Sequence, residues 1–131
     1  MELLNVVVAT VVAFGAGAGW YNIFSKPWLD ATGIPFDENG KPEGGPTPVL
    51  FAVGFVFQLI VAGMMRHVFE ASGTVGVGAG LVAGAGIGAF FITPWIGLNN
   101  AYGGKPWKLT LIDGGYATVA CALMGLVLTL F

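Results

Sequence analysis

The sequence predicts an all-α membrane protein in which four transmembrane helices form two similar antiparallel hairpins. Charged residues make up only 9% of the 131 positions, and hydrophobic residues make up 56%. Most of the chain lies in four long apolar stretches: residues 3–23, 49–65, 75–98 and 109–131. Each stretch approaches the roughly 20 residues that an α-helix needs to cross a bilayer core, and a soluble core of this size cannot cover so much apolar surface. We therefore expect one four-helix transmembrane domain over residues 1–131.

The first helix is expected over residues 3–24. Residues 16–18 resemble a signal-peptide cleavage site, but no basic n-region precedes them, so we expect the helix to be retained. Aromatic side chains near the helix ends are expected at the lipid headgroups as interface anchors: Trp20, Tyr21, Trp28, Trp95 and Trp107. Pro27 is expected to end the first helical segment, because a proline inside a helix removes a backbone hydrogen bond.

A polar segment, residues 29–48, follows as the one long loop. Within it, Asp37-Glu38-Asn39-Gly40 is a strong turn signal, and a plain surface turn is the favoured interpretation. A small β-ribbon around Asn39-Gly40 is one alternative. A calcium loop through Asp37, Asn39 and Glu43 is another, although their spacing fits no complete calcium-binding template.

The other three helices are expected over residues 47–71, 74–99 and 109–131. Pro94 lies one turn before the end of the third helix and leaves the carbonyl of Phe90 without its usual donor. We therefore expect a local kink in this helix.

The segment at residues 21–29 resembles the segment at residues 99–107, and both place Lys-Pro-Trp just past an odd-numbered helix. This similarity predicts a parallel internal repeat of one hairpin, related by an axis along the membrane normal. Four loop lysines lie on the side of loops 1 and 3: Lys26, Lys41, Lys105 and Lys108. Only Arg66 lies on the other side, so the positive-inside rule places loops 1 and 3 in the cytoplasm and both termini outside.

The third helix carries glycines at every fourth position: Gly76, Gly80, Gly84 and Gly88. Such a ridge lets another helix approach closely, and Gly15 and Gly19 in the first helix offer a matching surface. The favoured interpretation is helix packing, within the chain or between chains. The alternative is a backbone-lined groove for a lipid tail, a pigment or a solute.

Asp113 is the only acid well inside a predicted crossing, near the start of the fourth helix. We expect its carboxylate to accept hydrogen bonds from its own helix N-terminus or from loop 3, close to Lys105 or Lys108. The alternative is a proton or ion site. That site would include Asn99, Asn100 and Tyr116.

The composition argues against several other functions. A net charge of −2 is opposite to what nucleic-acid binding requires, and Cys121 is a lone apolar-segment cysteine without a disulfide partner. His67, four residues after Gly63, resembles an axial ligand below a macrocycle, but no second ligand supports haem or pigment binding. We expect no metal, no cofactor and no catalytic activity, and we expect bound lipid.

The chain resembles a known family in several segments: Ala13-Phe14 through Gly19-Trp20-Tyr21, Phe24-Ser25-Lys26-Pro27-Trp28, Gly33, Arg66-His67 before Ser72-Gly73, the run from Gly104 to Tyr116, and Met124-Gly125. It is similar to the bacterial membrane family catalogued as domain of unknown function 1761. The resemblance implies a four-helix membrane protein and no particular activity. Loop 1 is longer and the third helix richer in glycine than in that family. The Asp113 position is often Asn there, which implies a hydrogen-bonding role.

Two functions follow as expectations. The leading one is a helix-packing accessory subunit of a larger membrane complex, or a homo-oligomer, in the bacterial plasma membrane. The alternative is a small transporter or channel with a pathway between the two hairpins, carried by the residues around Asp113. Only Gln58 and Thr10 are polar residues near the predicted bilayer centre, so little of the chain could line a wet pore.

Overall fold

The computed structural model describes residues 2–35 and 47–131. The described residues form helices and connections: α1 (Glu2–Ile23), α2 (Ser25–Thr32), α3 (Pro48–Ser72), α4 (Val77–Ile87), η1 (Gly88–Ile92), α5 (Thr93–Tyr102) and α6 (Trp107–Leu130). Among these described residues, four stretches are long and apolar enough to cross a membrane: Leu3–Ile23, Pro48–Ser72, Val77–Tyr102 and Trp107–Leu130. The predicted all-α fold with four membrane-spanning helices is confirmed.

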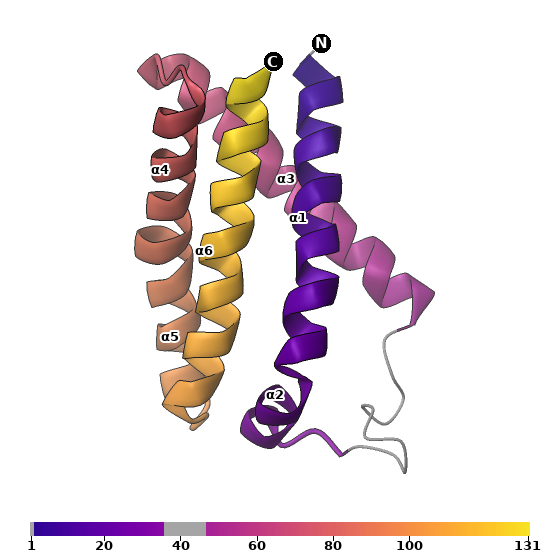
Figure 1. Ribbon diagram of the computed structural model, residues 1–131. Coiled ribbons are helices and arrows are strands. Elements are labelled where there is room, and N and C mark those ends of the chain that lie inside the picture. The colour runs from indigo at the N-terminus through magenta and orange to yellow at the C-terminus, as the bar shows by residue number, and fades with distance from the viewer. Residues whose placement is uncertain (1, 36–46) are drawn as a thin grey trace.

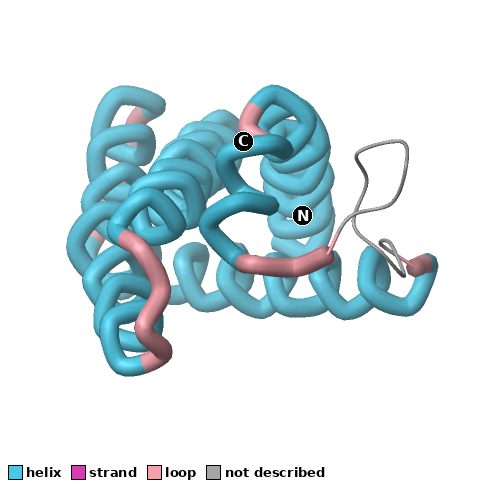
Figure 2. Tube along the Cα trace, turned by 90° about the horizontal axis from the view of Figure 1, so that it is seen from below, coloured by secondary structure: helices cyan, strands magenta, loops and turns pink. Residues whose placement is uncertain are grey.

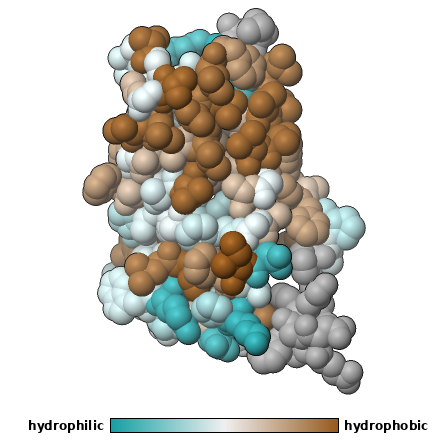
Figure 3. Space-filling model, viewed as in Figure 1, coloured by the Kyte–Doolittle hydropathy of each residue, from teal (hydrophilic) through white to brown (hydrophobic). Residues whose placement is uncertain are grey.

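Helix α6 stands between α1 on one side and the α4–η1–α5 column on the other, and α3 crosses them obliquely (Figures 1 and 2). α6 contacts all the other helices and is the most buried span. Both chain ends lie at one end of the bundle with the α3–α4 turn, and α2 lies at the other (Figure 1). Hydrophilic side chains gather at the α2 end, and apolar side chains dominate the upper part of this face (Figure 3).

Three glycines let the α4–η1 segment lie directly against α6. A Cβ on Gly80 would collide with Gly125 and Thr129, and one on Gly84 would collide with the backbone of Cys121. A Cβ on Gly88 would lie 2.5 Å from the Cα of Thr118. The close approach therefore requires glycine at these positions.

The other predicted ridge glycines do not contribute to this contact. Gly76 precedes α4 with a φ of 96°, a conformation that glycine adopts without strain. No described atom lies within 4 Å of a Cβ built on Gly15 or Gly19. The expectation that these two face the ridge is wrong within one chain, because α6 lies between α1 and α4.

Pro27 does not end a helical segment as expected, whereas the kink expected at Pro94 stays a prediction. Pro27 is the third residue of α2, in the first turn, where a missing N–H costs no hydrogen bond. The helix therefore continues to Thr32 and ends at Gly33 with a φ of 73°. Before Pro94, the chain forms the π-helical turn η1, and the Thr93 hydroxyl donates to the carbonyls of Gly88 (2.7 Å) and Gly114 (3.1 Å).

Loops 1 and 3 meet at one end of the bundle, where Lys105 Nζ donates to the Thr32 carbonyl over 2.8 Å. The internal repeat remains a prediction. Its two Lys-Pro-Trp copies differ locally, since Pro27 lies inside α2 and Pro106 precedes α6. The turn, the β-ribbon and the calcium loop predicted at residues 37–43 lie outside the described residues.

Candidate functional site

The carboxylate of Asp113 lies in α6, six residues past the helix start, and faces the last turn of α1 and the short α2. Tyr21 Oη donates to Asp113 Oδ1 over 2.6 Å, and Trp28 Nε1 donates to the same oxygen over 3.1 Å. Within the described part of the chain, Asp113 forms no ion pair, and its Oδ2 accepts no hydrogen bond. One carboxylate oxygen is thus held by two neutral donors.

The expected partners of Asp113 were wrong. Asp113 lies beyond the first four residues of α6, whose N–H groups alone lack a partner inside the helix. Among the described contacts, neither lysine pairs with Asp113: Lys105 donates to the Thr32 carbonyl, and Lys108 is exposed. The Asp113 carboxylate therefore joins α6 to α1 and α2 through its hydrogen bonds with Tyr21 and Trp28.

Tyr116 extends this polar cluster one turn further along α6. Its hydroxyl donates to the Ala13 carbonyl over 2.6 Å and accepts a hydrogen bond from Gln58 Nε2 over 3.0 Å. The rings of Tyr21 and Tyr116 meet edge to face with centroids 5.4 Å apart. The other amide oxygen, Gln58 Oε1, is buried without a hydrogen-bond partner.

Two glycines let α1 and α6 approach closely around the cluster, because each faces a large aromatic side chain of the other helix. A Cβ on Gly17 would lie 2.7 Å from Tyr116 Oη, and a Cβ on Gly115 would lie 2.8 Å from the Trp20 ring. Trp20 Nε1 also donates to the Ile112 carbonyl over 3.0 Å. The polar atoms of Trp20, Tyr21 and Trp28 bind α6, and their expected role as interface anchors stays a prediction.

A cavity of about 370 Å³ opens beside the cluster, between α1, α2 and α3 on one side and η1, α5 and α6 on the other. Its polar end is formed by Tyr21, Trp28, Gln58, Asp113 and Tyr116. Its remaining walls are apolar or thiol side chains: Val61, Ile92, Ile96, Ala117, Ala120, Cys121 and Met124. A cavity of about 300–1,000 Å³ with a few convergent polar groups is typical of small-molecule sites.

Several predicted site residues lie apart from this cavity. Asn100 Nδ2 donates to Thr110 Oγ1 over 3.1 Å, and Asn99 is exposed. His67 is exposed, and the described residues contain no group of three or more His, Cys, Asp or Glu side chains that could hold a metal. Trp95 and Trp107 are 66% and 76% exposed, so their rings are available to the bilayer.

The roles of Tyr21, Trp28 and Gln58 were missed at the sequence level. A signal was present for the first two. In a bundle of four antiparallel helices, the first helix ends beside the start of the fourth. An acid near the start of the fourth helix can therefore accept hydrogen bonds from Tyr and Trp side chains that follow the first helix. Gln58 carried no comparable signal, because the oblique path of α3 decides what it meets.

Comparison of the sequence with protein-family models gives a match to "Protein of unknown function (DUF1761)" over residues 4–129. Comparison with curated proteins and with solved structures gives no match. The family match covers nearly the whole chain, including every residue of the cavity described above. The chain belongs to the DUF1761 family.

Proposed function

We propose that this chain is a small, non-enzymatic membrane transporter that binds a cationic amphiphile in the cavity around Asp113. The observation that carries the proposal is the Asp113 carboxylate, which lines the cavity. Its Oδ1 accepts hydrogen bonds from Tyr21 and Trp28, and no described cation lies beside it. An ionisable group inside a membrane span is costly, so its presence favours a functional role.

The polar end of the cavity favours a ligand that donates hydrogen bonds. Asp113 Oδ2 and Gln58 Oε1 are acceptors without a donor among the described residues. An ammonium group offers three donors and a positive charge, and hydrogen bonds to an ionised partner are roughly twice as strong as neutral ones. The apolar remainder of the cavity matches an alkyl or aromatic body.

The position of the cavity supports transport rather than simple storage. Its walls come from both hairpins, so a rocking motion of one hairpin against the other would change access to it. The π-helical turn η1 contributes Ile92 to its wall, and such turns occur frequently at functional sites.

Thermal unfolding in detergent with a chain-matched octyl series tests the ligand class. Octylammonium should raise the melting temperature of the wild type, whereas octanol and octanoate should have little effect. Octyltrimethylammonium keeps the charge but has no N–H donor, so it should stabilise less than octylammonium. Equal stabilisation by octanol and octylammonium would refute the assignment of a cationic ligand.

Proteoliposomes then test transport. Uptake of radiolabelled octylammonium should exceed that of protein-free liposomes, and Asp113→Asn should reduce the excess while the protein remains folded. Octylammonium also crosses bilayers unaided, so the protein-dependent part of the rate is the quantity to compare. No protein-dependent uptake alongside normal binding would limit the function to binding.

A second candidate is a helix-packing accessory subunit or a homo-oligomer. It is favoured by the small residues on α1 that no described part of the chain covers, since Gly15 and Gly19 have no described neighbour within 4 Å of a Cβ. Native mass spectrometry in mild detergent tests it. A dimer lost in Gly19→Leu, but kept in Gly63→Leu on α3, would support it, and a strict monomer would contradict it.

For either function, we propose a bacterial plasma membrane location with loops 1 and 3 in the cytoplasm and both termini outside. The lysine bias supports this orientation. The meeting of Lys105 with the end of α2 supports placing both loops on one side.

A further inference from the structure

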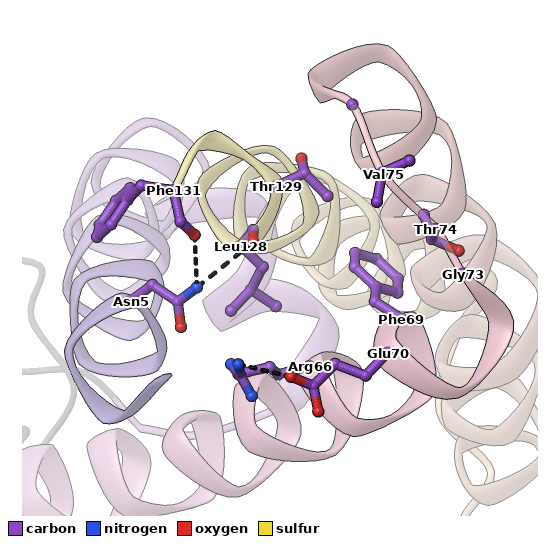
Figure 4. Close-up of a pocket in the computed structure, with 11 residues that line it drawn as sticks. Asn5, Arg66, Phe69, Glu70, Gly73, Thr74, Val75, Leu128, Thr129 and Phe131 are labelled. Carbon is purple, nitrogen blue, oxygen red and sulfur yellow. Dashed lines mark hydrogen bonds and ion pairs between the residues drawn. The ribbon is translucent and has the colours of Figure 1, made fainter. Parts of the chain in front are cut away.

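A second cavity, of about 320 Å³, lies at the end of the bundle that holds the two chain ends, opposite to Asp113 and α2. Figure 4 shows the residues that line it. It opens beside the turn between the end of α3 at Ser72 and the start of α4 at Val77. These residues end one membrane-spanning stretch and begin the next. A ligand in this cavity would therefore sit at the level of the lipid headgroups.

One wall of the cavity holds a buried side-chain amide whose nitrogen forms hydrogen bonds and whose oxygen forms none. Asn5 is 5% exposed, and its Nδ2 donates to the carbonyls of Phe131 (2.9 Å) and Leu128 (3.4 Å). Its Oδ1 is buried without a hydrogen-bond partner. That oxygen points away from the two carbonyls, toward the α3 side of the cavity (Figure 4). An unpaired buried acceptor is costly, so a donor is expected there.

The facing wall carries one charge of each sign. Arg66 Nη2 and Glu70 Oε1 form an ion pair at 2.6 Å, one turn apart on α3. The Glu70 side chain is 59% exposed and that of Arg66 is 21% exposed, so the carboxylate is the more accessible of the two. Phe69 and Leu128 line the apolar part of the cavity beside them.

We propose that this cavity binds a phosphoethanolamine group, in which a primary ammonium stands beside a phosphate. The ammonium donates to Glu70 and to Asn5 Oδ1, and the guanidinium of Arg66 faces the phosphate. The apolar side chains accommodate the start of an acyl chain or glycerol backbone. The group reaches the site as a phospholipid headgroup or as the free soluble molecule, and the test separates these two sources.

The experiment uses delipidated protein in detergent and native mass spectrometry with chain-matched phosphatidylethanolamine and phosphatidylcholine. The wild type should retain the ethanolamine lipid at least fivefold better, because the choline headgroup has no N–H donor. Glu70→Gln, a change at an exposed side chain, should remove this preference. Asn5→Leu should do the same where it folds, and Asp113→Asn should keep the preference because it lies in the other cavity.

Soluble phosphoethanolamine as competitor identifies the source. Displacement of the lipid at equal concentration supports the free molecule, and no displacement at a hundredfold excess supports the lipid. Equal retention of the two lipids by the wild type would overturn the proposal. An unchanged ethanolamine preference in folded Glu70→Gln would overturn it as well.

Discussion

Tyr21 donates its hydroxyl hydrogen to Asp113 Oδ1 across 2.6 Å, and this bond joins the last turn of α1 to α6 inside the membrane-spanning part of the bundle. Trp28 on α2 donates to the same oxygen, so one carboxylate connects the start of α6 to the end of α1 and to α2. The arrangement gives Asp113 a structural role through Oδ1 and leaves Oδ2 without a donor among the described residues.

The two roles of Asp113 separate in a pair of substitutions. Asp113→Asn keeps an oxygen acceptor for Tyr21 and Trp28, so the loss of stability should be small. Asp113→Leu leaves both donors without an acceptor and should lower the free energy of unfolding by about 1–3 kcal/mol. Thermal unfolding in detergent measures both. Asn as damaging as Leu would show that the fold needs the charge and not only the acceptor.

The glycines of α4 offer a matched pair. Gly84→Ala places a Cβ against the Cys121 backbone, which cannot move aside easily, so overpacking should cost about 1–3 kcal/mol or more. Gly86→Ala, two residues away, meets no described atom within 4 Å and should be neutral, or stabilising by up to about 1 kcal/mol. Equal effects of the two on thermal stability would mean that α4 does not lie on α6 as described.

The π-helical turn should depend on the Thr93 hydroxyl, which bonds both the Gly88 carbonyl and the Gly114 carbonyl of the neighbouring helix. Thr93→Val keeps the shape and removes both bonds, so it should cost about 1–3 kcal/mol. Thr118→Val is the control, because Thr118 bonds only the carbonyl four residues before it in α6. The Thr93 variant should melt at a lower temperature than the Thr118 variant, and equal melting temperatures would contradict this role of the hydroxyl.

The orientation can be tested by cysteine labelling in a Cys121→Ala background. Lys105→Cys should react with an impermeant maleimide only after the membrane is opened, and Thr74→Cys should react in intact cells. Lys105 is exposed in the turn before α6, and Thr74 is partly exposed in the turn before α4. The two turns lie at opposite ends of the bundle (Figure 1). The reverse labelling pattern would place loops 1 and 3 outside.

Hydropathy alone was enough to predict the four spans, because the bilayer selects for length and apolar composition in each segment independently. The role of Asp113 could not be read the same way. Its partners come from residues about 85 to 92 positions earlier, and only the placement of α1 and α2 against α6 brings them together. The aromatic residues at the end of α1 and in α2 therefore gave no sign in the sequence of their hydrogen bonds to α6.

The glycine pattern illustrates the same limit. Spacing by four predicts a close contact but does not name the partner, since any small-residue face satisfies it. Gly15 and Gly19 have a suitable spacing in the sequence. In the fold, however, Gly125 and the backbone of Cys121 are the groups that contact the glycines of α4. Pro27 likewise lies within one turn of the boundary between α1 and α2, but it is the third residue of α2 and not the start of a loop.

Equilibrium binding of radiolabelled octylammonium to purified protein tests whether the cavity beside Asp113 holds a cationic amphiphile. The wild type should bind one molecule per chain. Asp113→Asn and the cavity-filling Ala117→Leu should each bind at least about tenfold more weakly, which corresponds to roughly 1.4 kcal/mol. Ala101→Leu, at an exposed position away from the cavity, should bind as the wild type does. Equal affinity in all four folded proteins would contradict the claim.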